Sequence, residues 1–412
     1  MTDMSQALPA AEHPFVKARW ASLLGALLIC ICAGFGYAWS VLQNPIVAAY
    51  HWPDTQVSLA YTITVVCSTM APLFFGGLIR RMSTRTCVMA GAVLFGGGLF
   101  LTGMMNAVWQ LYLCYGVLSG LGCGFIYPSM MAYVVRLFPE RSGMASGLGT
   151  AAYGSGAILW APVAVRLTGA FSLAAAFRVL GVVFLAVILV CALCFLREPP
   201  EEFRQLMCPE EGEGSAAATG LRRGQMVRTG TFCLMVVVFT CGLVAGVIVI
   251  SQASPILQQV LDYTPERAAV FVSVFAACNM AGRFVWGSLS DRLGIRSTVA
   301  VVFCLCILSM AVLAAVDQPA AVLCGMGLAA SCYGGFASVL TPLTARMFGP
   351  RYITENYGVM YVVFGIASLI GPSLAVSFKT AAGGSYTGAF CTAAALALLG
   401  LVLSRFIKPK SE

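Results

Sequence analysis

Residues 276–294 read AACNMAGRFVWGSLSDRLG and place one charged side chain, Arg283, inside an otherwise apolar segment. The chain has 412 residues, of which 59% are hydrophobic and only 10% are charged, and its mean hydropathy is +0.88. Ordinary globular domains carry about 25% charged residues. A membrane-spanning helix needs roughly 20 mainly apolar residues, and such segments recur along nearly the whole chain. The sequence therefore predicts an all-α membrane protein.

Twelve segments have the length and composition of a spanning helix. We expect them at 20–48, 55–79, 86–106, 108–135, 143–166, 172–196, 230–260, 266–289, 297–316, 319–347, 355–378 and 384–405. The longest polar break, 197–229, contains Pro, Glu, Gly and Arg without apolar periodicity and separates two groups of six. The predicted division is a tail at 1–19, a six-helix bundle at 20–196, a linker at 197–229, a second six-helix bundle at 230–405 and a tail at 406–412.

Basic residues give the predicted orientation. Most of the 24 Lys and Arg residues fall in the tails and in loops on one side of the predicted spans, and such loops face the cytoplasm. No cleavable signal peptide is apparent at the N-terminus. We therefore expect a monomer that crosses the cytoplasmic (inner) membrane many times, with both termini in the cytoplasm. The net charge of +8 then reflects topology, and no nucleic-acid partner is implied.

The sequence offers no arrangement typical of an enzyme or a metalloprotein. We see no zinc-type or catalytic spacing among the 17 Cys, and free Cys in apolar helices behaves as a small hydrophobe. The two His, His13 and His51, lie outside the predicted spans. We expect no catalytic residues, no metal and no cofactor. The longest loop has about 30 residues, which also disfavours a receptor with a soluble signalling domain.

Two loops indicate that the halves are related. Residues 76–86 read GGLIRRMSTRT and residues 287–297 read GSLSDRLGIRS, each after the second helix of its group. The second loop carries the gating candidates Gly287, Asp291, Arg292, Gly294 and Arg296. It resembles the G-x-x-x-D-R-x-G-x-R signature of the major facilitator superfamily, whereas the first loop lacks the acidic residue. The resemblance implies two pseudo-symmetric six-helix bundles that rock around a central cavity.

Arg283 has three possible explanations. A cation at the bilayer centre costs at least about 2.5–3.5 kcal/mol, so it normally faces a partner or a cavity. Snorkelling to the headgroups is disfavoured. Helical Cβ atoms point toward the N-terminus of their helix, and Arg283 lies near the C-terminal end of the predicted span 266–289, so its side chain leans back toward the midplane. A structural ion pair is also disfavoured: every Asp and Glu lies in a tail, a loop or near a helix end, and Asp291 is about 12 Å further along the axis.

The remaining explanation is that the counter-ion is the substrate. A guanidinium presents a planar fork that matches a carboxylate. Asn279 lies one turn earlier on the same face and can add an amide contact. Tyrosines in five spans are candidates to complete the pocket, although packing is nearly as good an explanation for any single one. These are Tyr37, Tyr127, Tyr153, Tyr333 and Tyr361.

Four segments carry a closer resemblance. They read GFGYAWSVLQNP (34–45), ERSGMASGLGTAAYGSG (140–156), NMAGRFVWGSLSDRLG (279–294) and NYGVMYVVFGIASLIGP (356–372). They resemble the oxalate/formate antiporter family and are similar to monocarboxylate transporters. The resemblance implies that Arg283 binds a small carboxylate between the halves, with Tyr37, Tyr127 and Tyr153 in the pocket.

Two departures from the family pattern refine the expected substrate. Phe364 stands where the oxalate exchanger has a Lys, so the pocket offers a single cation and favours a monocarboxylate such as lactate, pyruvate or formate. Asn279 stands where animal monocarboxylate transporters have an Asp, so this position cannot titrate. We expect a proton-coupled secondary transporter that works by alternating access.

Three questions stay open on the sequence alone. The transporter could instead exchange anions, so that its second partner is a proton or a counter-anion. It could also carry an unrelated organic solute. Lys379, near the outer end of the eleventh span, either attracts anions or anchors the helix at the interface.

Overall fold

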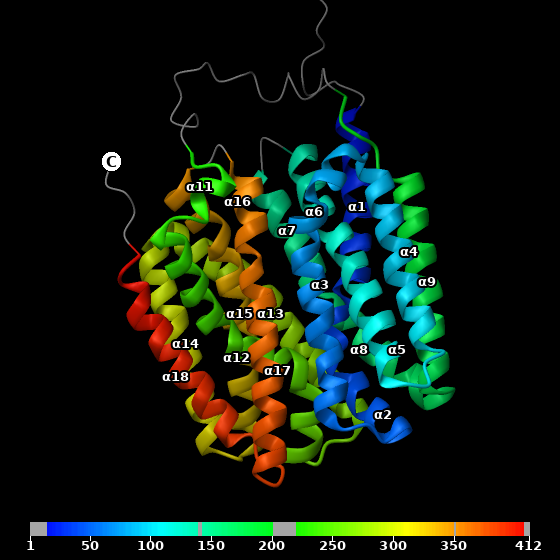
Figure 1. Ribbon diagram of the computed structural model, residues 1–412, viewed down its shortest axis with the longest axis vertical. Helices are drawn as coiled ribbons and strands as arrows, with labels where there is room; N and C mark the ends of the chain where they lie inside the picture. Colours follow the sequence, from blue (N-terminus) through cyan, green and yellow to red (C-terminus); the bar gives the residue numbers. More distant parts are fainter. Residues whose placement is uncertain (1–14, 139–141, 201–219, 350–351, 408–412) are drawn as a thin grey trace, which may run out of the picture.

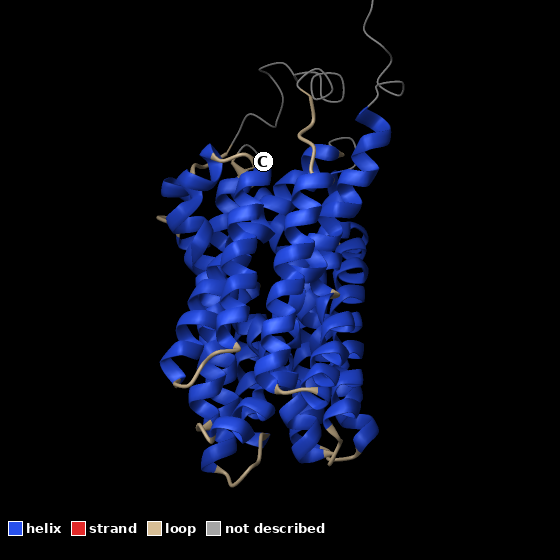
Figure 2. Ribbon diagram, turned by 90° about the vertical axis from the view of Figure 1, so that its right-hand side faces the viewer, coloured by secondary structure: helices blue, strands red, loops and turns tan. Residues whose placement is uncertain are grey.

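The computed structural model describes residues 15–138, 142–200, 220–349 and 352–407, and these ranges form helices joined by short connections (Figures 1 and 2). Twelve helices, some built from adjoining segments, are long and apolar enough to cross a membrane. The predicted all-α, multi-pass class is thereby confirmed. The predicted division at 1–19, 197–229 and 406–412 falls largely on residues outside the described ranges and stays a prediction.

We refer to described residues 15–200 as the N-terminal half and 220–407 as the C-terminal half. The N-terminal half contains α1 (Phe15–Ala33), η2 (Gly34–Ala38), α2 (Ser40–Tyr50), α3 (Asp54–Arg81), α4 (Thr84–Thr102), α5 (Val108–Leu111), η3 (Tyr112–Ser119), α6 (Gly120–Leu137), α7 (Ser142–Gly154), α8 (Gly156–Ala170) and α9 (Leu173–Cys194). The C-terminal half contains α11 (Arg223–Met226), α12 (Gly230–Val260), α13 (Pro265–Leu293), α14 (Ile295–Ala315), α15 (Pro319–Phe348), α16 (Ile353–Met360), α17 (Val362–Ala381) and α18 (Thr387–Ser404).

Each half has its own aromatic core. In the N-terminal half Phe184 packs on Phe35, Phe95 and Trp160, with ring centroids 4.6–5.6 Å apart. In the C-terminal half Phe336 packs between Phe239 and Phe303 at 6.2 and 4.7 Å. Because lipid tails are as apolar as these side chains, close packing rather than exclusion from water holds such helices together.

Three predicted continuous spans are interrupted in the structure, and a fourth, 108–135, passes through the π-helical segment η3 without a break. The first passes through the 3₁₀ segment η2, the fifth breaks at Ser155 between α7 and α8, and the eleventh breaks at Tyr361 between α16 and α17. The first two breaks touch: a Cβ on Gly34 would lie 2.1 Å from the carbonyl oxygen of Tyr153. Only glycine permits this backbone contact, which brings η2 directly against the end of α7.

Two prolines expose backbone carbonyls at the contact between the halves. Proline lacks an N–H, so the carbonyl four residues earlier loses its helical partner. Pro372 in α17 thus frees the carbonyl of Ser368, which accepts a hydrogen bond from the Thr62 hydroxyl of α3 at 2.9 Å. The same arrangement recurs in the other half: Pro162 in α8 frees the carbonyl of Ile158, which lies 3.2 Å from the Ser273 hydroxyl of α13.

The two ends of the bundle are distinguished by their contacts. We call the end where α1 begins and α18 ends the terminal end, and the opposite end the distal end (Figure 1). Toward the distal end, the amides of Gln43 and Gln252 hydrogen-bond each other at 3.0 and 3.2 Å. Lys379 forms an ion pair with Asp54 there. Each pair joins one half to the other, so the distal end is closed.

Candidate functional site

Arg283 lies on α13 at the contact between the halves. Its side chain is only 9% exposed. Its Nη2 atom donates to the Tyr37 hydroxyl of η2 at 3.1 Å, and its Nε atom donates to Oδ1 of Asn279 at 3.3 Å. A Cβ on Gly154, at the end of α7, would lie 3.3 Å from Nε. The guanidinium is therefore packed against both helix breaks, and the two hydrogen-bond partners described here are uncharged.

Asn279 has an amide group that is incompletely satisfied. The residue is 1% exposed, and its Nδ2 atom has no hydrogen-bond partner among the described residues. Arg283 can only donate, so its contact assigns Oδ1 and leaves the NH₂ group free. A buried donor without a partner costs about 1–3 kcal/mol. Together with the guanidinium, whose two described acceptors are neutral oxygens, this group makes the site a set of donors without an anionic partner among the described side chains.

A close backbone contact fixes the position of Asn279. A Cβ on Gly334 of α15 would lie only 2.2 Å from the backbone oxygen of Asn279. Glycine at 334 therefore lets α15 lie directly against the turn of α13 that carries the site. The donors of Asn279 and Arg283 are held by packed backbone rather than by a loop.

The five predicted tyrosines surround this pair. Tyr153 packs on Tyr37 and Tyr127, with ring centroids 5.5 and 4.3 Å away. Tyr361 lies 5.9 Å from Tyr127, and Tyr333 lies 6.4 Å from Tyr37. Tyr37 accepts a hydrogen bond from Arg283, and the other four rings are linked to Tyr37 through these contacts.

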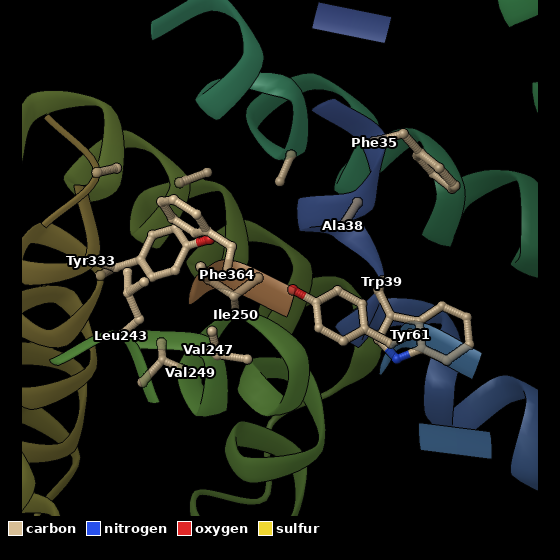
Figure 3. Packing of buried hydrophobic residues seen from close by; sticks show 14 of the residues in the cluster. Phe35, Ala38, Trp39, Tyr61, Leu243, Val247, Val249, Ile250, Tyr333 and Phe364 are labelled. Atoms are coloured by element: carbon tan, nitrogen blue, oxygen red, sulfur yellow. The ribbon is translucent and has the colours of Figure 1, made fainter. Parts of the chain in front are cut away.

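Phe364 completes the cluster on the side of the C-terminal half. Its ring lies 4.8 Å from Tyr361 and 5.8 Å from Tyr333, and Figure 3 shows it beside Tyr333. The structure thus brings all eight predicted binding residues together, from six different helical segments. Their role in binding a ligand stays a prediction.

Two further tyrosines of this cluster are absent from the sequence prediction. Tyr357 packs on Tyr361, with ring centroids 5.9 Å apart. It lies one turn before Tyr361 in the same NYG segment, and this helical spacing could have identified it from the sequence. Tyr61 of α3 is 5% exposed, and its hydroxyl points toward that of Tyr333 (Figure 3). Nothing in its apolar sequence context distinguishes it from a packing residue.

The gating candidates predicted in a loop span the junction of two helices: Gly287, Asp291 and Arg292 lie in the last turns of α13, Arg296 lies in the first turn of α14, and Gly294 joins the two. Gly294 has φ +83°, a left-handed conformation that favours glycine. Arg296 donates to the carbonyl of Ile407 at 2.6 Å, and Arg292 is exposed. A Cβ on Gly287 would meet only the Ser338 side chain, at 3.8 Å. The Asp291 side chain lies outside the described ones, and the gating role of the loop stays a prediction.

Lys379 is placed by its ion pair with Asp54. Both side chains are about one-fifth exposed, and they join α17 to the start of α3. Neither of the two explanations left open by the sequence includes this ion pair, which gives the charge of Lys379 a partner in the other half.

Comparison with known proteins identifies the family. The sequence matches the model of the Major Facilitator Superfamily over residues 24–333. It is 28% identical to the uncharacterised transporter YhjX of Escherichia coli K12, covering 86% of this chain and 87% of that protein. It is 25% identical to the oxalate:formate antiporter of Oxalobacter formigenes, covering 95% and 92%. It is 23% identical to monocarboxylate transporter 12 of Rattus norvegicus, covering 94% and 85%.

The family match spans well over half of the chain, and the three relatives are named as transporters. The twelve apolar helices and the predicted superfamily loop agree with this match. The chain belongs to the Major Facilitator Superfamily of membrane transporters.

Proposed function

We propose that this protein is a secondary active transporter that moves a small monocarboxylate across the cytoplasmic membrane by alternating access. The observation that carries the proposal is the donor set of Arg283 and Asn279, which is buried between the halves and lacks an anionic partner among the described side chains. A monocarboxylate supplies two acceptor oxygens and one negative charge, which matches this set. The relatives named for oxalate, formate and monocarboxylates support the same class.

The proposed substrate carries a single charge because the cluster contains one cation. Phe364 packs on Tyr361 and Tyr333 where a second cation would be needed to hold a second carboxylate. Lactate, pyruvate and formate therefore fit better than oxalate. The aromatic walls fit the apolar remainder of such molecules.

Electrostatics links binding to transport in this proposal. Closing both ends around an empty site buries an unpaired guanidinium, at a cost of several kcal/mol. A bound monoanion makes the site nearly neutral. The loaded carrier therefore changes between its two open states faster than the empty one.

In this proposal both termini lie in the cytoplasm, so that the closed distal end faces outward. The protein acts as a monomer.

Two coupling schemes are compatible with this electrostatic argument. In proton symport, the proton enters with the substrate carboxylate or through a peripheral carboxyl group, since Asn279 does not titrate. In anion exchange, the empty carrier returns slowly and a counter-anion accelerates it, as the name of the oxalate:formate relative suggests. A pH gradient drives the first scheme, and an internal anion drives the second.

The test is uptake of radiolabelled lactate, formate and oxalate into proteoliposomes, with and without a pH gradient or internal anion. Arg283→Gln is expected to lower lactate and formate uptake at least tenfold, because one lost charge-assisted contact weakens binding by about 1.5–3 kcal/mol. Arg283→Lys keeps the charge but loses the fork, so it should retain a fraction of the activity.

Arg267→Gln is the matched control, since Arg267 lies in the first turn of the same helix, over the ring of Tyr263. It is expected to leave uptake unchanged. Wild-type uptake by correctly folded Arg283→Gln protein would refute the proposed function.

A further inference from the structure

A small cavity of about 60 Å³ lies beside the tyrosine cluster, almost entirely within the N-terminal half. Tyr37, Tyr153 and Tyr361 belong both to its wall and to the cluster around Arg283. The cavity is therefore adjacent to the proposed anion site. A buried water needs at least about 10–15 Å³ of such space, so the cavity holds a few non-hydrogen atoms and no more.

The polar part of the cavity wall includes hydroxyl groups from α3 and η3, together with the Cys123 thiol and the hydroxyls of the lining tyrosines. Thr64, Thr69 and Ser119 each donate their hydroxyl proton to a backbone carbonyl, at 2.9, 3.1 and 3.2 Å. Once its proton is used in this way, a hydroxyl oxygen can still accept a hydrogen bond. These three oxygens therefore remain available as acceptors, among apolar neighbours such as Phe35 and Phe95.

The charge of the cavity wall also limits which chemical groups can bind there. The described residues that line the cavity include no Lys, Arg or His. An ionised carboxylate has only acceptor atoms, so in this cavity it would face other acceptors without a cation. A hydroxyl group on the substrate can donate a hydrogen bond to these acceptors. A methyl group on the substrate forms no hydrogen bonds and needs no polar partner.

We propose that this cavity is a second subsite, which receives the uncharged end of the substrate while Arg283 holds the carboxylate, and that it favours an end bearing a hydroxyl group. The inference rests on the proposed carboxylate transport and narrows its substrate class to short 2-hydroxy acids, such as lactate or glycolate. It also gives a second physical reason for excluding a dicarboxylate. Formate has no second end and does not use the subsite.

Gly36 allows the subsite to be filled without disturbing its surroundings. It lines the cavity, and a Cβ at this position would meet nothing within 4 Å. Gly36→Ala and Gly36→Val therefore occupy the cavity in two steps. Gly97→Val is the matched control: Gly97 lies in α4 of the same half, a Cβ added there would also meet nothing within 4 Å, and the residue does not line the cavity.

Uptake of lactate and formate is measured for each variant in proteoliposomes, with thermal unfolding as the check on folding. Gly36→Val is expected to lower lactate uptake at least tenfold and to leave formate uptake within twofold, with Gly36→Ala in between. Unchanged lactate uptake would overturn the subsite, as would an equal loss of both substrates. If Arg283→Gln abolishes uptake while Gly36→Val does not alter it, the proposed function stands and only the subsite fails.

Thr69→Val tests the preference for a hydroxyl group. Valine keeps the shape of threonine and removes the acceptor oxygen. The ratio of lactate to propionate uptake is expected to fall about fivefold, which is the effect of one lost hydrogen bond. The uptake of propionate and formate should be unchanged. An unchanged ratio would show that the subsite does not recognise the hydroxyl group.

Discussion

Arg283 shows how a single residue can define the chemistry of a buried site. Its two described hydrogen bonds go to Tyr37 and Asn279, which carry no charge. The neighbouring amide of Asn279 has a free donor. Arg283 and the Nδ2 atom of Asn279 thus provide donors for the proposed carboxylate, and this bias follows from residue types rather than from a flexible arrangement.

Asn279→Asp is the sharpest residue-scale test of this bias. The new carboxylate would lie about 3.3 Å from Nε of Arg283, where it pairs with the guanidinium and competes with the substrate. We predict at least a tenfold loss of lactate uptake at pH 7.5. The guanidinium lowers the pKa of the introduced carboxylate, which therefore stays ionised at pH 5, so the loss of uptake should persist as the pH falls.

The measurement is the initial uptake rate between pH 5 and 8, compared with that of Asn279→Leu. Leucine has a similar volume and no titratable group, so its uptake should follow the wild-type pH profile at a reduced level. Uptake should be lower for Asn279→Asp than for Asn279→Leu across this range, because only the aspartate competes with the substrate. Equal uptake by the two variants would contradict the predicted competition.

At the scale of elements, helix breaks and prolines place the site and join the halves. Each break carries a tyrosine of the cluster. Tyr37 lies in η2, Tyr153 lies just before the break at Ser155, and Tyr361 itself separates α16 from α17. Discontinuous helices commonly line binding sites in membrane transporters, because irregular backbone is tolerated where it borders a cavity. Pro372 and Pro162 act differently, since each leaves a carbonyl for a hydroxyl of the opposite half.

A double-mutant cycle tests the role of Pro372. Thr62→Val leaves the Ser368 carbonyl without a partner and should lower the free energy of unfolding by about 1 kcal/mol. In a Pro372→Ala background the helix supplies its own N–H to that carbonyl, so Thr62→Val should then have little effect. Thermal unfolding in detergent gives the coupling energy.

Ser273→Ala and Pro162→Ala form the companion cycle. Its coupling should be smaller, because the Ser273 hydroxyl also lies 3.1 Å from the carbonyl of Ala269 in its own helix. Additive effects in both cycles would show that the prolines do not create these contacts.

At the scale of the whole molecule, the closed distal end defines the conformation. Gln43 with Gln252, and Asp54 with Lys379, join the halves at this end. Alternating access requires these contacts to separate when the site opens on that side. A partly exposed ion pair contributes about 0–1 kcal/mol, so the pair is weak enough to break in each cycle.

Asp54→Asn and Lys379→Gln are predicted to act alike. Each removes the ion pair and favours opening of the distal end, so each should lower the KM for external lactate by up to about fivefold. The exchanged double variant, Asp54→Lys with Lys379→Asp, should restore the wild-type KM. If Lys379 attracted anions instead, Lys379→Gln would raise KM while Asp54→Asn would not.

The sequence alone determined the membrane class, the number of spans, the superfamily and the residues of the proposed site. These properties depend on hydropathy over about 20 residues and on charges that are rare in lipid, and Arg283 is conspicuous in such a background. The tertiary structure decided the helix breaks, the pairing of Lys379 with Asp54, and the parts played by Tyr61 and Tyr357. Those features depend on which segments meet across the two halves. Hydropathy does not distinguish an aromatic residue that meets the other half from one that faces lipid, and the charges of Lys379 and Asp54 do not by themselves show that the two residues pair.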